Sequence, residues 1–152
     1  MPNQPASHRL RTGRHAEPNR IYLLTANTLG REPVFNDFAL GRLVVHQFQQ
    51  AQNLGLATTL AWVVMPDHFH WLIELNSPSL RDLMRRTKSL SAREVNLATF
   101  RRGPLWQQGY HDRALRREED LQNVARYVVA NPLRAGLVKR LGNYPLWDAI
   151  WI

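Results

Sequence analysis

Two histidines separated by one aromatic residue lie in the most apolar stretch of the chain, residues 62–75. This stretch is rich in branched and aromatic side chains, which is typical of a buried β-strand. Alternate side chains of a strand point to opposite faces, so His68 and His70 share one face with Glu74. The larger apolar residues, such as Phe69, then pack on a core. Two imidazoles on a rigid strand form half of a metal site, although the same spacing also fits two partly exposed histidines.

A tyrosine and an asparagine form a second candidate pair near the end of a helix predicted for residues 118–130. Tyr127 and Asn131 are four residues apart, so a continuing helix would place them on one face, beside its apolar stripe. A helix lying across a sheet would aim both side chains along the sheet surface, where the histidines lie. Taken alone, the pair also fits a tyrosine that keeps its hydroxyl in water and an asparagine that ends a helix.

Together these side chains indicate phosphoryl-transfer chemistry. Two imidazoles and an amide oxygen can bind a divalent cation with open positions, and such an ion polarises a phosphoryl oxygen. A phenol is a weak nucleophile at neutral pH because its pKa is about 10, so it needs an activated phosphate. Attack would give a phosphotyrosine ester, which retains the bond energy for rejoining.

Composition indicates one globular domain with irregular ends. The chain has 152 residues, no cysteine, and no apolar run long enough to span a membrane. The first residues lack the apolar core of a signal peptide, so we expect a cytoplasmic protein. Residues 1–19 hold three prolines and almost nothing apolar, which predicts a flexible basic arm.

The charge of the chain favours nucleic acid as a partner. The 20 basic residues outnumber the 12 acidic ones, and 18 of them are arginine. Arginine binds phosphate bidentately and stacks on bases, although a GC-rich genome, which favours arginine codons, would leave the same excess. The residues expected to contact DNA lie on a basic helix and after a short strand: Arg81, Arg85, Arg86, Lys88, Arg113, Arg116 and Arg117.

The pattern of elements predicts an α+β fold in the order β-α-β-β-α-β-α. Strands are expected at residues 20–28, 56–65, 68–75 and 105–111, with a hairpin turn at Pro66-Asp67. Helices are expected after a cap at Asn36-Asp37 and after a cap at Ser77-Pro78-Ser79, and the last one ends at Pro132. The helical pattern weakens near residues 89–91, which leaves a second helical segment through Val95 open.

Two segments carry a resemblance to a known family. The sequence MPDHFH at residues 65–70, together with YVVANPLRAGLV at residues 127–138, closely resembles the REP-associated tyrosine transposases. These belong to the single-tyrosine HUH transposases of insertion sequences. The similarity runs from about Ile21 to Trp147 and includes residues 31–35 and Trp106-Gln107.

The resemblance implies a ferredoxin-like or RRM-like antiparallel sheet with packed helices. It implies His68 and His70 as metal ligands and Tyr127 as the nucleophile. Asn131 is then the third ligand, at a position where relatives often have glutamine, and Glu74 is the competing ligand. The family uses Mg²⁺ or Mn²⁺, whereas ligand chemistry alone would also allow zinc or iron.

The resemblance also implies a substrate and a domain plan. The family acts on single-stranded DNA hairpins from repetitive extragenic palindromes (REP) with an adjacent short tetranucleotide, leaving a 5′-phosphotyrosine link and a free 3′-hydroxyl. We therefore expect an arm at residues 1–19, an HUH domain at 20–138 and a tail at 139–152 that can cover the active site. The protein would be nucleoid-associated, as a monomer or a homodimer.

Two other functions compete with this one. A domesticated relative would hold REP hairpins without cutting them, through its arginines alone. A phosphodiesterase with paired His-x-Thr motifs is disfavoured, because the chain has only one His-x-His.

Overall fold

The computed structural model of the chain describes residues 20–116 and 121–150. The arm predicted for residues 1–19 and the predicted DNA contact Arg117 therefore lie outside the described residues. The strands are β1 (Ile21–Asn27), β2 (Ala57–Met65), β3 (His68–Leu75), β4 (His111–Ala114) and β5 (Trp147–Ala149). The α-helices are α2 (Phe38–Asn53), α3 (Leu80–Thr99), α4 (Leu121–Val129) and α5 (Asn131–Arg134), with short 3-10 turns at Leu29–Arg31, Val34–Asn36 and Leu141–Asn143.

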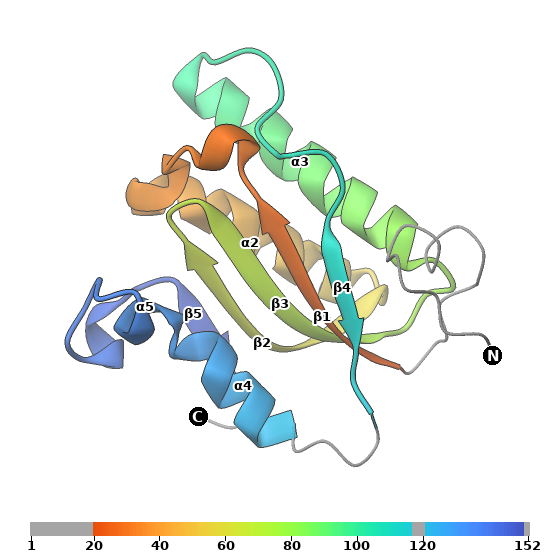
Figure 1. Cartoon of the computed structure of the whole chain (residues 1–152). Coiled ribbons are helices and arrows are strands. Elements are labelled where there is room, and N and C mark those ends of the chain that lie inside the picture. The colour runs from red at the N-terminus through yellow and green to blue at the C-terminus, as the bar shows by residue number, and fades with distance from the viewer. Residues whose placement is uncertain (1–19, 117–120, 151–152) are drawn as a thin grey trace.

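The strands form one antiparallel sheet in the order β4-β1-β3-β2-β5. Helices α2 and α3 lie against one face of this sheet, and α4 crosses the other face over β2 and β3 (Figure 1). The predicted α+β class with an antiparallel sheet is thus confirmed. Within the described residues, no helix combines the length and apolar character that a membrane span requires.

The face of the sheet covered by α2 and α3 holds the main aromatic core. Phe48 of α2 stacks on Trp71 of β3 with 4.4 Å between the ring centroids, and Phe69 packs edge-on to Phe48 at 5.1 Å. The indole N–H of Trp71 donates to the Thr59 hydroxyl at 2.9 Å, so its polar atom is satisfied. A slip of β3 by one residue would expose these rings and bury the histidines, so the core fixes the register of the histidine strand.

The opposite face, here called the histidine face, carries the candidate site. Directly paired residues of neighbouring strands point to the same side, and His70 is paired with Thr25 of β1. His68 is paired with Asn27, and the next residue on this face, Leu72, is fully buried. Helix α4 packs on β2, β3 and β5. The two histidines, by contrast, are half-buried.

The β2–β3 turn and the starts of α2 and α3 match their sequence signals closely. The β2–β3 hairpin turns at Pro66-Asp67 as predicted. Helix α2 begins after Asp37, whose carboxylate accepts from the Ala39 amide at 3.0 Å, and α3 begins after Ser79, whose hydroxyl accepts from the Asp82 amide at 3.0 Å. Helix α3 is continuous to Thr99, so the weak pattern near residues 89–91 does not interrupt it.

The fourth strand was predicted too early in the chain. β4 begins at His111, and Trp106 makes only an isolated bridge to Thr28. Trp106 is buried instead, where its ring packs 5.3 Å from Phe69 and its N–H donates to Ser91 at 3.0 Å. Gly109, with a positive φ of 81°, interrupts the extended backbone between the two segments.

The last predicted helix is divided into two. α4 ends at Val129 and α5 begins at Asn131, so Tyr127 and Asn131 do not lie on one continuous helix. Pro132 lies in the first turn of α5, where a proline needs no amide hydrogen. The sequence reasoning treated this proline only as the end of a helix, whereas it starts the next one.

The segment expected as a tail joins the sheet. Trp147–Ala149 pairs with β2 as the edge strand β5, and Leu146 is fully buried against Gly41 of α2. The Tyr144 hydroxyl donates to the Val64 carbonyl at 2.6 Å, and burial raises the pKa of this phenol to about 12. Residues 141–149 therefore belong to the folded domain, and the boundary predicted at residue 138 does not separate them from it.

Candidate active site

The two histidine rings lie beside each other at the first residues of β3. Their centroids are 5.0 Å apart, and their planes are nearly perpendicular, at 80°. Both side chains point to the histidine face because they alternate with the buried Phe69 and Trp71. The structure therefore brings the pair together as the strand pattern predicted.

A carboxylate fixes the orientation of His68. The Nδ1 atom of His68 lies 2.7 Å from Oδ1 of Asp67, and Oδ2 of Asp67 accepts from Nε of Arg31 at 2.9 Å. Burial alone would raise the pKa of the Asp67 carboxyl, but the bonds and charges of His68 and Arg31 hold this pKa below its usual value. An ionised carboxylate only accepts hydrogen bonds, so in a neutral His68 ring it holds the proton on Nδ1 and leaves Nε2 with a lone pair.

A hydroxyl supports His70 in the same way. Nδ1 of His70 lies 2.8 Å from Oγ1 of Thr25 on the neighbouring strand. The pKa of His70 is lowered to about 4, mainly by burial and in addition by the electrostatic effects of the neighbouring His68 and of Arg134. The ring is therefore neutral at pH 7. When Nδ1–H donates to Thr25, Nε2 of His70 is also left with its lone pair.

The turn after β1 holds the carboxylate of Asp67 in place. The Asp67 carbonyl accepts from the Thr28 amide at 2.9 Å, and the Pro66 carbonyl accepts from the Phe35 amide at 2.9 Å. Arg31 adopts a left-handed conformation with φ of 55°, which is uncommon for a residue other than glycine. Such strain persists only where the surroundings stabilise it. Here the ion pair with Asp67 does so.

Sequence reasoning missed Arg31, Asp67 and Thr25 as supports of the histidines. Asp67 was interpreted only as a turn residue, although an acidic neighbour of a candidate metal-binding histidine is a signal for such a bond. Arg31 and Thr25 gave no signal, because their contacts depend on pairing between segments 36 and 45 residues apart.

The two proposed third ligands differ in position. Asn131 is half-buried, and its side-chain nitrogen donates to the Val128 carbonyl at 2.8 Å. Its Oδ1 atom, which could bind a cation, makes no hydrogen bond within the described residues. Glu74 lies four residues from His70 on β3, a separation of about 13 Å along a strand. No three His, Cys, Asp or Glu side chains of the described residues gather closely enough to hold an ion, so Glu74 does not join the pair.

Tyr127 lies on α4 with 62% of its surface exposed. The guanidinium carbon of Arg134 lies 3.7 Å from the centroid of its ring, which is a cation–π contact. The charge of Arg134 also acts on His70. Arg134 thus acts on both Tyr127 and His70, and sequence reasoning gave it no role.

The predicted DNA contacts divide between two layers. Arg81, Arg85 and Arg86 lie on α3, behind the sheet as Figure 1 shows, whereas Arg113 is paired with Leu23 on the histidine face. The structure thus does not join these arginines into one surface. Arg116, which follows β4, is exposed.

Lys88 is engaged inside the fold. Its ammonium group donates to the carbonyl oxygens of Gln107 and Gly109, so it holds the loop before β4. A DNA phosphate could bind Lys88 only by displacing these bonds, and the contact of Lys88 with DNA stays a prediction.

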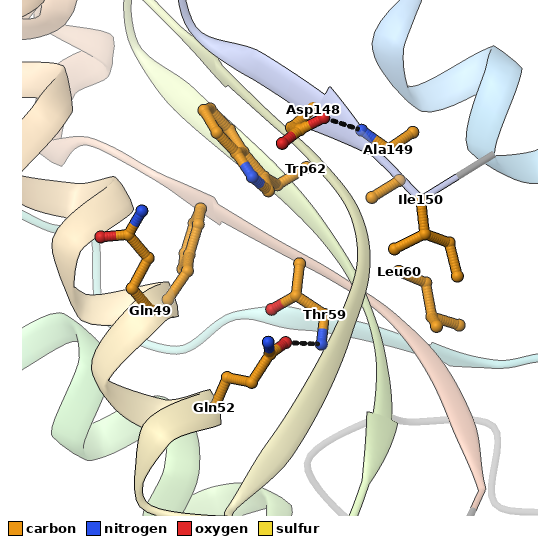
Figure 2. A pocket seen from close by; sticks show the side chains of 10 residues that line it. Gln49, Gln52, Thr59, Leu60, Trp62, Asp148, Ala149 and Ile150 are labelled. Carbon is orange, nitrogen blue, oxygen red and sulfur yellow. Dashed lines mark hydrogen bonds between the residues drawn. The ribbon is translucent and has the colours of Figure 1, made fainter. Parts of the chain in front are cut away.

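Two hollows lie on opposite faces of the sheet. The larger, of about 260 Å³, lies between α2 and the β2–β5 edge, and Figure 2 shows Gln49, Trp62 and Asp148 around it. Trp62 is paired with Trp71, so this hollow faces away from the histidines and contains no predicted site residue. The smaller hollow, of about 220 Å³, lies along β1 next to Thr25.

A family model supports the class that the sheet, the histidine pair and the tyrosine helix indicate. The model described as "Transposase IS200 like" matches residues 20–131. The chain therefore belongs to the IS200-like transposase family.

Two individual proteins and one solved structure are similar to this chain. A REP-associated tyrosine transposase of Escherichia coli K12 is 26% identical over 87 residues, which cover 56% of this chain and 50% of that protein. A Haemophilus influenzae relative is 26% identical over 98 residues, which cover 57% and 56%. The chain thus spans about half the length of these relatives. The fold is similar to that of a REP-associated tyrosine transposase solved with a REP hairpin, with a TM-score of 0.70 at 20% identity, covering 86% of this chain and 77% of that one.

Proposed function

We propose that the protein is a metal-dependent endonuclease and strand transferase that acts on single-stranded DNA at REP-type hairpins. The observation that carries the proposal is the histidine pair, whose Nδ1 atoms are held by Asp67 and Thr25. The Nε2 atoms are then available to a cation on the same face. Arg134, whose guanidinium stacks on the Tyr127 ring, also acts electrostatically on His70, which supports a role for Tyr127 at this site.

The bound ion would be Mg²⁺ or Mn²⁺, as the family resemblance implies. Both ions are held by a few protein ligands with water in the other positions. The Nε2 atoms of His68 and His70 and the Oδ1 atom of Asn131 would hold the ion. When bound, it would withdraw charge from a phosphoryl oxygen of the DNA. Asp67 and Thr25 would keep the two rings oriented, which is how residues around a metal ligand strengthen binding.

Tyr127 would act as the nucleophile. Its phenolic oxygen forms a bond to the scissile phosphorus while the bond to the 3′-oxygen breaks. The phenol gives up its proton, the departing oxygen takes one up, and the 3′-hydroxyl is freed. The 5′-phosphate remains on Tyr127 as an ester, so one phosphoester bond replaces another and no energy source is consumed. Attack by a second 3′-hydroxyl then reverses the step and joins the strands.

Arg134 would act on both the Tyr127 ring and the DNA phosphate in this reaction. Its guanidinium lies over the Tyr127 ring and is exposed, so it can also reach a DNA phosphate. The cation would limit the motion of the ring and offset the negative charge that the phosphate brings to the site.

Family membership and the hairpin-bound fold relative support the substrate class. A hairpin with single-stranded flanks presents the unpaired phosphodiester that an exposed tyrosine can reach. We also propose that the substrate carries a short tetranucleotide beside the hairpin. The protein would act in the bacterial nucleoid.

Formation of a covalent adduct tests the proposal. The purified chain is incubated with hairpin oligonucleotides copied from the DNA that flanks its gene, with Mg²⁺ or Mn²⁺, and run on a denaturing gel. We expect an adduct that disappears with EDTA and whose peptide maps to Tyr127 by mass spectrometry. Tight hairpin binding without cleavage, in the presence of either Mg²⁺ or Mn²⁺, would instead indicate the non-cleaving DNA-binding function.

Removing the carboxylate behind His68 should weaken metal binding. We expect Asp67→Asn to lower the Mn²⁺ affinity about 10- to 100-fold, because the His68 ring loses its orientation and its fixed proton. Mn²⁺ titration followed by electron paramagnetic resonance measures the effect. Asp82→Asn, which alters an exposed carboxylate on α3, is the matched control and should leave the affinity unchanged. Equal affinities in both variants would show that Asp67 does not support the ligand.

A further inference from the structure

The smaller hollow has no role in the proposed metal binding or in the attack by Tyr127. It lies between β1 and the segment that leads into β4, and we call it the β1–β4 hollow. Its volume is about 220 Å³. The residues that line it are Thr25, Asn27, Gln107, Gln108, Gly109, Tyr110 and His111.

The β1–β4 hollow is on the same face as the histidine pair. Thr25 is paired with His70 on one side and with His111 on the other, so the three side chains form a row across β3, β1 and β4. Asn27 is paired with His68 in the same way. Neighbouring strands are about 4.8 Å apart, so the hollow begins one strand away from the proposed metal ligands. Thr25 belongs to both, since its hydroxyl bonds His70.

The fold itself maintains this hollow. The Gln107 amide donates to the Asn27 carbonyl at 2.8 Å, and the Lys88 ammonium group holds the carbonyls of Gln107 and Gly109 from the other layer. Gly109, at a φ of 81°, lets the backbone bulge away from β1. The loop is thus fixed at both ends of the bulge, and its side chains are presented in a defined place.

The lining of the hollow matches an uncharged group with hydrogen-bonding edges. None of the residues that line it is an arginine, lysine, aspartate or glutamate, so it lacks the charges that favour a phosphate. The side-chain amides of Asn27, Gln107 and Gln108 each offer a donor and an acceptor. An amide pairs bidentately with an adenine, and unpaired bases can be bound by such edge contacts and by stacking on rings. The volume is below the 300 Å³ or more of pockets for drug-sized ligands, so it suits one base.

We infer that the β1–β4 hollow binds one unpaired nucleobase, adenine by preference, next to the scissile phosphate. The inference rests on the proposed function, because it takes single-stranded DNA as the substrate. It assigns the hollow a positioning role: a base held there would fix the strand relative to the histidine pair. Gln107 is the main residue expected to hydrogen-bond the base edge, because its backbone is anchored to β1 while its side chain is exposed.

A scan with abasic sites tests the inference. The full chain carrying Tyr127→Phe is used, so that binding is measured without cleavage. Fluorescence anisotropy gives Kd for labelled hairpin oligonucleotides in which each base of the single-stranded flank is removed in turn. We expect one position at which base removal weakens binding about 10-fold or more, the size of a bidentate base contact. Adenine should be the preferred base there.

Two added substitutions locate the contact. Gln107→Ala or Asn27→Ala should reduce the effect at that position to about 2-fold or less, while the other positions keep their values. Gln49→Ala is the matched control, because it removes an amide from the hollow on the opposite face, and it should keep the full effect. Circular dichroism verifies that each variant is folded.

Two outcomes would overturn the inference. One is an effect of base removal on Kd that is the same in Gln107→Ala and Asn27→Ala as in the Tyr127→Phe chain without them. The other is a scan in which no position of the flank depends on its base. A pyrimidine preference at the sensitive position would overturn the assignment of adenine. Because the scan measures binding alone, it can succeed when the adduct experiment fails, and it can fail when the adduct forms.

Discussion

Tyr127→Phe is expected to abolish the covalent adduct, lowering its rate of formation by about 10³-fold or more. The substitution removes only the attacking oxygen, and loss of a nucleophile leaves just the contribution of binding and positioning. The side chain is 62% exposed, so the change removes no buried contact of the hydroxyl and the fold should persist. The stacking with Arg134 should also persist, because a phenylalanine ring retains its face.

Two measurements separate this chemical effect from a loss of binding. The affinity of Tyr127→Phe for the uncleaved hairpin should stay within about 2-fold of the parent, because the exposed hydroxyl contributes little to binding. Tyr22→Phe serves as the control, since Tyr22 alternates with the histidine-face residues of β1 and is buried on the opposite side. That variant should still form the adduct. An adduct that persists in Tyr127→Phe would remove Tyr127 from the role and direct the search to another hydroxyl.

The parts of the fold that depend on local sequence could be predicted. The alternation in residues 68–75 gave both faces of β3, and the short polar side chains of Asp37 and Ser79 gave the starts of α2 and α3. These signals depend only on a few neighbouring residues.

The parts that depend on pairing between distant segments could not be predicted. β5 exists because Trp147–Ala149 meets the free edge of β2, and no local pattern indicates that a three-residue strand has a partner there. The supports of the histidines have the same origin. Thr25 and Arg31 reach His70 and Asp67 only after β1 is placed beside β3.

One strand register determines both the proposed metal site and the β1–β4 hollow. The pairing of Thr25 with His70 gives the imidazole its support, and the pairing of Thr25 with His111 forms the wall of the hollow. Shifting β1 by one residue would turn Thr25 and Asn27 to the aromatic core and replace them by Leu24 and Ala26. The aromatic packing on the far side therefore maintains the geometry of the site.

The stability of the metal-free protein is expected to fall by about 3 kcal/mol as the pH is lowered from 7 to 4. The pKa of His70 is about 4 in the folded state and about 6.5 in the unfolded chain. Between these values the unfolded state binds a proton that the folded state does not, so acid favours unfolding. The Asp67 carboxyl, whose pKa lies below its usual value, titrates below this window and adds a further loss only at lower pH.

Urea unfolding in EDTA at several pH values measures this dependence. His70→Gln should flatten it, because the variant has no imidazole to protonate at that position, whereas His111→Gln removes an exposed imidazole from the same row and should retain it. A steep loss of stability that survives in His70→Gln would show that another group is responsible. The test also bears on the chemistry, since a ring that resists protonation down to about pH 4 keeps its Nε2 lone pair available to a cation at neutral pH.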